Sequence, residues 1–196
     1  MKKGILLPVL FLSALFLFSC RAATETGPVF DAVLPAEKAL EAAKKEDVVV
    51  IENSRCTSGK KLWDAFYAKT EKKEPASVVC ASFRTLDKES VSEELYKAQK
   101  DRYPQLTFTL IEFDGETFRA RTRLSTVEKA DDTGSYRYLL HLSGDMPPSA
   151  RYAHYDHYVL SDDPSLTWEQ ILAVYVSSSA HPVIPRHFPV FSSYTD

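Results

Sequence analysis

Apolar residues recur at helical spacing in the N-terminal half of the chain. Residues 35–45 begin with a proline and end on two lysines, which suit the two ends of a helix and its macrodipole. A second helix is predicted from a cap at Thr57 or Ser58 to about residue 72, because its apolar positions fall on one face. That face carries Leu62, Trp63, Phe66 and Tyr67.

Two further helices are predicted closer to the C-terminus. Residues 89–99 have a thin apolar stripe and favour a short helix. The Thr-Trp-Glu-Gln sequence at 167–170 fits a capping box, in which the first and fourth side chains each bond a backbone N–H at the helix start. After Ala180 the chain holds three prolines and shows no periodic signal, so no element is predicted there.

Segments rich in β-branched and aromatic residues predict strands between and after these helices. Four contiguous apolar residues at 48–51 are typical of a buried strand, and the next strand is predicted over 77–85. Further strands are predicted over 106–113, 116–124, 136–142 and 152–160.

The Asp114-Gly115 dipeptide predicts a hairpin with a type I′ turn between two of these strands. Pairing residues outward from the turn assigns two faces to the hairpin. We expect one face to point to the core, and it carries Thr109, Ile111, Phe113, Phe118, Ala120 and Leu124. The other face carries Phe108 and Leu110 beside Arg119, Arg121 and Arg123.

The order of these elements predicts an α+β fold, with a mainly antiparallel sheet and helices packed on it. The sequence contains no internal repeat. Residues 35–196 have a length that suits a single domain with a substantial core.

The first nineteen residues have the layout of a secretory leader. Lys2 and Lys3 precede an almost wholly apolar stretch, 4–18, which is shorter than the roughly 20 residues needed to span a bilayer. The leader ends in Leu17-Phe18-Ser19-Cys20, which fits a lipobox except for the phenylalanine. We expect cleavage before Cys20, acylation of that cysteine, for example with palmitate, and a tether over 20–34. The alternative is an ordinary signal peptide cleaved after Ala22 or Ala23.

This leader predicts a lipid-anchored protein on the extracytoplasmic face of a cell membrane or outer membrane, with the bilayer as partner through acylated Cys20. The full chain has 24 basic and 27 acidic residues, and loss of the two leader lysines leaves a net charge near −5. That balance argues against general nucleic-acid binding and against electrostatic docking on anionic lipid.

Two cysteines remain beyond the leader, Cys56 and Cys80. Outside the cytoplasm an isolated pair most simply forms a disulfide, which in the chain-entropy model stabilises a fold by roughly 3 kcal/mol. Two free thiols or half of a metal site are the alternatives, and no Cys-x-x-Cys redox motif is present.

Four parts of the segment 47–124 carry a resemblance to a known family. They are the strand opening Asp47-Val-Val-Val, the helix around 62–67, the strand at 78–85 and the hairpin Phe113-Asp-Gly-Glu-Thr-Phe118. The segment is similar to an uncharacterised family of small lipoproteins found mainly in Gram-positive bacteria, the domain of unknown function 4362. This chain is longer at its C-terminus and lacks the acidic-glycine stretch after Thr85. The resemblance implies a lipoprotein with an α+β fold, and it carries no activity and no functional residues across.

Arg119, Arg121 and Arg123 alternate along one predicted strand, so their guanidinium groups share a face. Such a row can clamp phosphate, carboxylate or an acidic polymer, because each guanidinium offers a bidentate fork. The simpler interpretation, which we favour, is a solvated face whose arginine stems cover Phe108 and Leu110, with Glu112 near enough for pairing.

Residues 151–158 form the densest cluster of functional side chains. In a strand His154 and Asp156 share one face and His157 points to the other, so a metal site with both histidines needs a bulge or a turn. We favour a plain strand in which Tyr152 and Tyr158 pack across the sheet or contribute to a ligand-binding surface. His181 and His187 can join the cluster only through the fold.

The motifs of common enzyme classes are missing, including a nucleophile elbow and a glycine-rich phosphate loop. No catalytic residue and no cofactor is assigned. We expect a lipid-anchored, non-enzymatic domain that binds a protein or a small ligand at the cell envelope. Two alternatives stay open: a metal-assisted envelope hydrolase that uses His154, Asp156 and His157, and an inhibitor of an extracellular hydrolase.

Overall fold

The computed structural model describes residues 28–176 and 184–196, over which the chain forms five α-helices and nine strands. This confirms the predicted α+β class. The helices are α1 (Pro28–Asp31), α2 (Ala36–Ala43), α3 (Lys60–Glu71), α4 (Glu93–Gln99) and α5 (Trp168–Val176). The strands are β1 (Val49–Glu52), β2 (Arg55–Ser58), β3 (Ala76–Arg84), β4 (Gln105–Phe113), β5 (Phe118–Leu124), β6 (Asp131–Tyr136), β7 (Tyr138–Asp145), β8 (His154–Ser161) and β9 (His187–Thr195).

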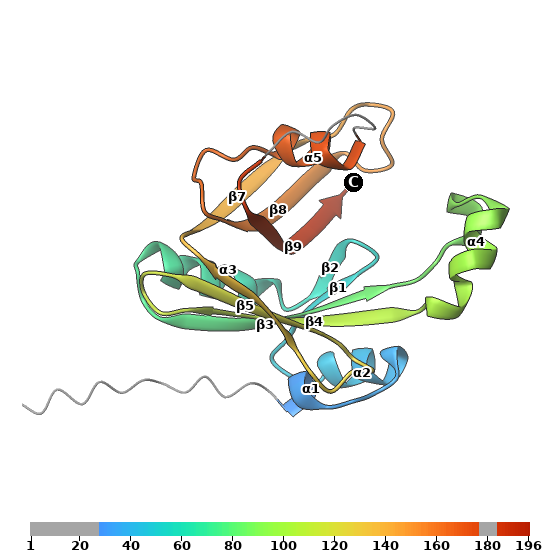
Figure 1. The fold of residues 1–196 in the computed structure, drawn as a ribbon, viewed down its shortest axis with the longest axis horizontal. Coiled ribbons are helices and arrows are strands. Elements are labelled where there is room, and N and C mark those ends of the chain that lie inside the picture. The colour runs from blue at the N-terminus through green and yellow to red at the C-terminus, as the bar shows by residue number, and fades with distance from the viewer. Residues whose placement is uncertain (1–27, 177–183) are drawn as a thin grey trace, which may run out of the picture.

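The strands form two sheets, which Figure 1 shows one above the other. The first sheet has six strands in the order β2-β1-β3-β4-β5-β6, and β1 and β3 are parallel while the other neighbours are antiparallel. The second sheet has three antiparallel strands in the order β7-β8-β9. The chain crosses from one sheet to the other at Arg137, between β6 and β7.

Both faces of the first sheet are covered. Helices α1 and α2 lie on one face, and α3 with the second sheet lies on the other (Figure 1). Phe108 and Leu110, placed by the sequence on the arginine-covered face, are buried beneath α1 and α2. The sequence therefore located the main core face correctly, except that Leu124 at its end is 41% exposed. The second core on the opposite side was not predicted.

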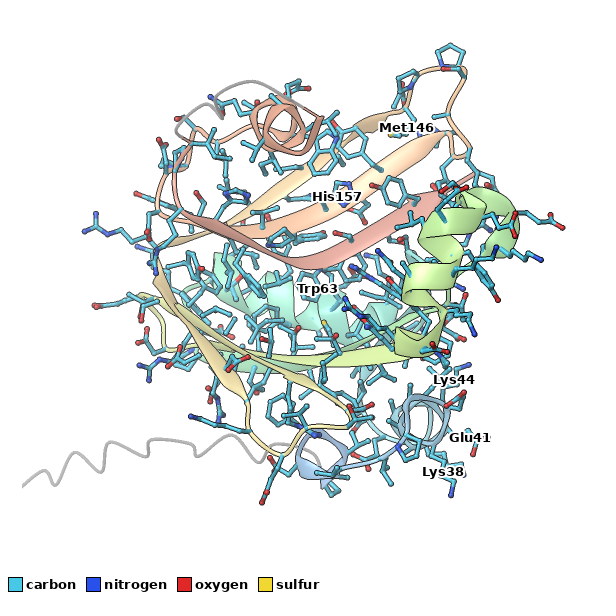
Figure 2. All side chains as sticks on the ribbon, turned by 45° about the vertical axis from the view of Figure 1, so that its right-hand side comes forward. Lys38, Glu41, Lys44, Trp63, Met146 and His157 are labelled. Carbon is cyan, nitrogen blue, oxygen red and sulfur yellow. The ribbon has the colours of Figure 1, made fainter. Side chains whose placement is uncertain are left out.

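Trp63 of α3 lies at the centre of the core between the two sheets (Figure 2). Its ring stacks on Phe191 of β9 at 4.7 Å between centroids and meets the edge of Tyr158 of β8 at 4.9 Å. Aromatic pairs at such distances add to the free energy gained from burial alone. One indole from the predicted apolar face of α3 thus joins the helix to the second sheet.

The N-cap of helix α3 is Gly59, and the predicted caps Thr57 and Ser58 belong instead to strand β2. Gly59 has φ +76°, and a Cβ atom there would approach the Val48 carbonyl oxygen to 2.5 Å. Only glycine fits this start without strain, because β1 passes directly beside it. The predicted capping box of α5 is confirmed: Thr167 N donates to Gln170 Oε1 at 2.9 Å and Gln170 N donates to Thr167 Oγ1 at 3.3 Å.

The hairpin between β4 and β5 has the predicted register, with Phe113 opposite Phe118 and Ile111 opposite Ala120. The type I′ assignment is wrong, because only Gly115 has a positive φ and that turn requires two such residues. Asp114 closes the loop instead, since its Oδ1 accepts hydrogen bonds from the backbone N–H groups of Glu116 and Thr117.

The sequence missed β9, in the region after Ala180 where no element was predicted, and it missed β2 and β6 as well. Pro189 lies within β9, on the edge of its sheet, where a missing N–H costs little. Prolines at 182, 185 and 189 thus hid a strand that supplies Val190 and Phe191 to the core.

Both cysteines are free thiols in the structure, so the predicted cross-link between Cys56 and Cys80 is not formed in it. Cys56 pairs with Ile51 and Cys80 with Val49, which places β1 between them. Two strand spacings amount to roughly 10 Å, whereas a disulfide requires Cα atoms within about 7 Å. Burial raises the pKa of both thiols.

The predicted leader and Cys20 lie outside the described residues, as does most of the tether. Among the described residues, no helix combines the length and the hydropathy needed to cross a bilayer.

Candidate functional site

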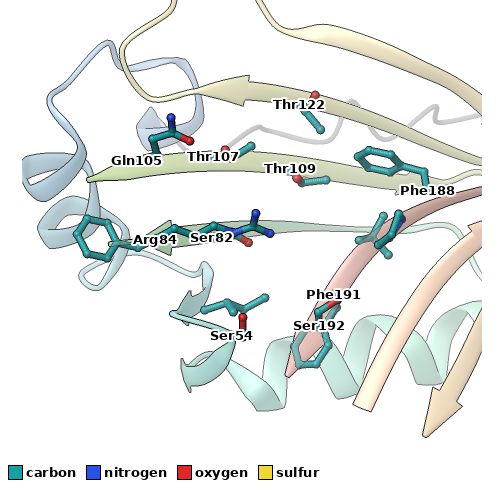
Figure 3. Close-up of a pocket in the computed structure, with 14 residues that line it drawn as sticks. Ser54, Ser82, Arg84, Gln105, Thr107, Thr109, Thr122, Phe188, Phe191 and Ser192 are labelled. Atoms are coloured by element: carbon teal, nitrogen blue, oxygen red, sulfur yellow. The ribbon is translucent and has the colours of Figure 1, made fainter. Parts of the chain in front are cut away.

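A cleft of about 390 Å³ opens between the first sheet and strand β9. We call it the inter-sheet cleft. Its floor is formed by β3, β4 and β5, and one wall by Phe188–Ser192 of β9 (Figure 3). Its volume falls in the range of about 300–1,000 Å³ that is typical of small-molecule sites.

The floor of the cleft is a patch of hydroxyl groups on three neighbouring strands. Ser82 of β3 lies opposite Thr107 of β4, and Thr109 of β4 lies opposite Thr122 of β5. Residues paired in this way have Cβ atoms about 5 Å apart, so the four side chains form one continuous surface. We call Ser82, Thr107, Thr109 and Thr122 the hydroxyl patch.

The hydroxyl patch continues the same sheet face that forms the core farther along. Val78, Ile111 and Ala120 occupy the equivalent inward positions beneath α3 and the second sheet, and all are buried and apolar. The change from apolar to hydroxyl side chains therefore coincides with the place where the covering layer ends and the cleft begins. The β-propensity of threonine is the same along the whole strand, so it does not explain why the threonines lie only in this half of the face.

The wall of the cleft depends on a β-bulge in β9. Tyr158 pairs with Phe191 while Val159 pairs with Pro189, so Val190 is the extra residue. Because of this bulge the consecutive residues Val190 and Phe191 are both buried, at 5% and 1% exposure. Phe188 precedes Val190 by two residues on β9, and it is half-buried beside the hydroxyl patch (Figure 3).

Hydrogen bonds between the two sheets fix the width of the cleft. Tyr194 N of β9 donates to Ser54 O at 2.8 Å, and Cys56 N of β2 donates to Ser193 Oγ at 3.1 Å. The turn at Ser54 is in turn attached to the end of β3, because Asn53 Oδ1 accepts from Thr85 N at 2.9 Å. The wall and the floor are thus joined through β2 and form a preorganised site.

Arg84 and Gln105 stand at the open end of the cleft, paired across β3 and β4. Arg84 is exposed and makes no ion pair with any residue in the described ranges. The residues that line the cleft include no Asp, Glu, His or Lys. The site thus offers hydroxyl groups, one amide, one cation and aromatic side chains, and these can bind a polar ligand but supply no general base or metal ligand.

The predicted arginine row is on one face of β5, as expected, but its members have different roles. Arg123 is 3% exposed and donates to the carbonyl oxygens of Phe30, Ala32 and Val127, which anchors the chain around α1. Arg121 Nη2 lies 3.5 Å from a Glu112 carboxylate oxygen, the pairing that the sequence suggested. Arg119 pairs with Asp132. The favoured interpretation of a solvated face is therefore wrong for Arg123, which is buried, while Arg119 and Arg121 are exposed or half-buried and paired. The alternative of an anion clamp is left without a row of unpaired guanidinium groups.

The predicted metal ligands are not brought together. His154 Nδ1 lies 2.6 Å from Asp145 Oδ1, and Asp156 Oδ1 lies 2.6 Å from His141 Nε2. His157 points to the opposite face of β8, under α5, as strand alternation requires. Across residues 28–176 and 184–196, no group of three or more His, Cys, Asp or Glu converges on a possible metal position. His187 lies apart at the start of β9, and His181 is outside the described residues.

The two tyrosines singled out by the sequence have unrelated roles. Tyr158 is 4% exposed and packs against Trp63 in the core, where burial raises its pKa to about 12. Tyr152 is half-buried, stacks on Tyr194 at 5.2 Å and has the Arg55 guanidinium over its ring at 5.1 Å. Neither borders the inter-sheet cleft.

The hydroxyl patch was not recognised as a site from the sequence. Thr109 was placed on the core face of the hairpin, which is correct, but the meaning of Thr107, Thr109 and Thr122 depends on where the cover ends. That cover is β9, which the sequence did not predict. A run of threonines on an otherwise apolar face was the available signal.

Comparisons with protein-family models, with curated proteins and with solved structures found no match for this chain. The resemblance to the domain of unknown function 4362 therefore stays a prediction.

Proposed function

We propose that this protein is a lipid-anchored extracytoplasmic lipoprotein that binds a small polar molecule in the inter-sheet cleft. The observation that carries the proposal is the hydroxyl patch: four neighbouring hydroxyl side chains without a side-chain hydrogen bond to any described residue, at the floor of a cleft of about 390 Å³. Water is the hydrogen-bond partner of such groups in an open cleft, and a polar molecule that replaces this water can bond all four hydroxyls.

The proposal of a lipid anchor is supported only by the sequence of the leader. The short apolar stretch followed by Leu17-Phe18-Ser19-Cys20 supports acylation of Cys20. Replacement of Cys20 with alanine should abolish metabolic labelling with palmitate and remove the processed protein from membranes. Unchanged labelling of Cys20→Ala would contradict the anchor and leave the cleft proposal untouched.

The binding claim is tested with the full chain in detergent by saturation-transfer NMR against pools of sugars, amino acids, dipeptides and nucleosides. At least one pool should bind. A second protein with Thr107→Trp, which places a large ring over the patch, should lose that binding.

The control is Ser149→Trp, because Ser149 is exposed in the turn between β7 and β8. The free energy of unfolding of both variants, measured by urea denaturation, should match that of the wild type to within about 0.5 kcal/mol. Binding that persists in Thr107→Trp, or the absence of binding from every pool, would overturn the proposal.

A further inference from the structure

We infer that the ligand of the inter-sheet cleft is an acidic sugar, a polyhydroxylated ring that carries one anionic group. This inference rests on the proposed function and adds the chemical class of the ligand. It depends on three features of the cleft: the arrangement of hydroxyls, the single unpaired cation and the aromatic wall.

The hydroxyl patch matches a ligand with several hydroxyl groups at regular spacing. Each serine or threonine hydroxyl donates one hydrogen bond and accepts others, which is also the capacity of each sugar hydroxyl. The Thr109 residue is 9% exposed, and its hydroxyl has no hydrogen bond to a described side chain or backbone group. This hydroxyl is therefore available to hydrogen-bond a ligand at the floor of the cleft.

The patch is arranged as two adjacent cross-strand pairs, Ser82 with Thr107 and Thr109 with Thr122. The patch therefore spans three neighbouring strands, with two positions on β4 and one each on β3 and β5. Such a surface suits the edge or the face of a ring better than a long aliphatic chain, which would leave the hydroxyls unpaired.

The charge of the cleft is set by Arg84. It lies next to Ser82 in Figure 3, at the open end of the patch, and no acidic residue lines the cleft to neutralise it. Two other exposed arginines are paired, Arg55 with Asp196 at 2.8 Å and Arg186 with Asp162 at 2.8 Å. Arg102, Arg137 and Arg151 are exposed and, like Arg84, form no ion pair with a described residue, but none of them lines the cleft. An unpaired guanidinium beside a neutral polar surface fits a carboxylate or a phosphate on the ligand.

The third feature of the cleft is its aromatic wall, which offers an apolar contact to the ligand. Phe188 is half-buried on β9 and faces the patch across the cleft. The C–H face of a sugar ring is apolar and packs on an aromatic side chain, while the hydroxyls at its rim turn to the opposite side. The hydroxyl patch, Phe188 and Arg84 therefore contact three different parts of one acidic sugar: its hydroxyl groups, its C–H face and its anionic group.

The test uses matched probes with the full chain, measured by isothermal titration calorimetry. The probes are glucuronate and galacturonate, the corresponding neutral sugars, cyclohexanecarboxylate and the two sugar 6-phosphates. One uronate should bind at least about tenfold more tightly than its neutral sugar and than cyclohexanecarboxylate, because only the uronate uses both Arg84 and the patch. A sugar phosphate that binds equally or more tightly supports the same chemistry and identifies the anionic group as phosphate.

Two variants assign the contributions. Arg84→Gln should reduce the affinity for the acidic sugar to that of the neutral sugar, and Thr109→Val should weaken both about fivefold. Matched controls are Arg137→Gln, at the opposite end of the first sheet, and Thr195→Val, at the far end of β9, and both should bind as the wild type does.

Three results would count against the inference. Equal affinity for acidic and neutral sugars, unchanged in Arg84→Gln, overturns the anionic group. Binding of a dipeptide or nucleoside that Thr107→Trp abolishes, with no binding of any sugar, overturns the sugar but leaves the proposed function standing. Failure of every probe and every pool to bind in a way that Thr107→Trp blocks overturns both.

Discussion

Replacement of His157 with phenylalanine should be tolerated at pH 7, and it should make the folded protein increasingly more stable than the wild type as the pH falls. His157 is 2% exposed and lies between the rings of Trp168, at 4.2 Å, and Tyr194, at 5.1 Å. Neither ring nitrogen has a hydrogen-bond partner among the described residues. A buried polar group without a partner costs about 1–3 kcal/mol, so an apolar ring of similar shape should be tolerated at pH 7.

The pH dependence follows from the same burial. Desolvation lowers the pKa of His157 from 6.5 to about 4, so the folded protein resists protonation that the unfolded chain accepts. As the pH falls below 6.5 the unfolded state binds more protons, and the free energy of unfolding decreases until the folded form also protonates near pH 4. At about 1.4 kcal/mol per pKa unit, the loss attributable to His157 is about 3 kcal/mol between pH 7 and pH 4.

Urea denaturation at pH 7, 6, 5 and 4 measures this difference directly. The wild type should lose about 3 kcal/mol more than His157→Phe over that range, since the other titrating groups are common to both proteins. His154→Phe is the matched control, because His154 is exposed on the same strand, and it should change the pH dependence by less than about 1 kcal/mol. Identical pH profiles for wild type and His157→Phe would refute the reasoning. So would a loss of more than about 2 kcal/mol at pH 7 in His157→Phe, which would indicate a hydrogen bond to the imidazole.

Three further predictions concern the framework around the cleft. Arg123→Met should cost about 2–3 kcal/mol and speed amide hydrogen exchange in residues 28–34, because three carbonyl oxygens lose a charged donor, whereas Arg119→Met should leave both unchanged. Gly59→Ala should lower the free energy of unfolding by more than about 1 kcal/mol, since φ is +76° and the new Cβ meets the Val48 carbonyl, and an unchanged urea midpoint would contradict that geometry. Non-reducing mass spectrometry should find Cys56 and Cys80 as free thiols, with Cys80 reacting with a thiol reagent only on unfolding, and a cross-link would contradict the position of β1 between them.

Elements set by local chemistry were predictable from the sequence. The capping box at Thr167 and Gln170, the helix at Ala36–Ala43 and the pairing of Phe113 with Phe118 depend on residues within a few positions of one another. Alternation along a strand also predicted correctly that His157 faces away from His154 and Asp156.

The cleft could not be predicted because its parts come from distant segments. Ser82, Thr107 and Thr122 become neighbours only through the order of the strands in the sheet. Phe188 lies beside them because it belongs to β9, which was not predicted because of the prolines in and before it. Arg123 is a second case in which a distant segment decides the environment of a residue, and here the segment buries a residue that was expected to be exposed. Its spacing suggested an exposed row, but α1 covers it, and a four-residue helix of this kind gives almost no periodic signal.

The central claim is that a ligand occupies the inter-sheet cleft, and chemical-shift mapping tests it most directly. In a titration of ¹⁵N-labelled protein with the tightest-binding probe, the amides of Ser82, Thr107, Thr109, Thr122 and Phe188 should shift together along one saturable curve. Amides of α2 and of the β7–β8 turn should not move. Saturable shifts confined to α5, to the β7–β8 turn or to the α1–α2 face would contradict the account.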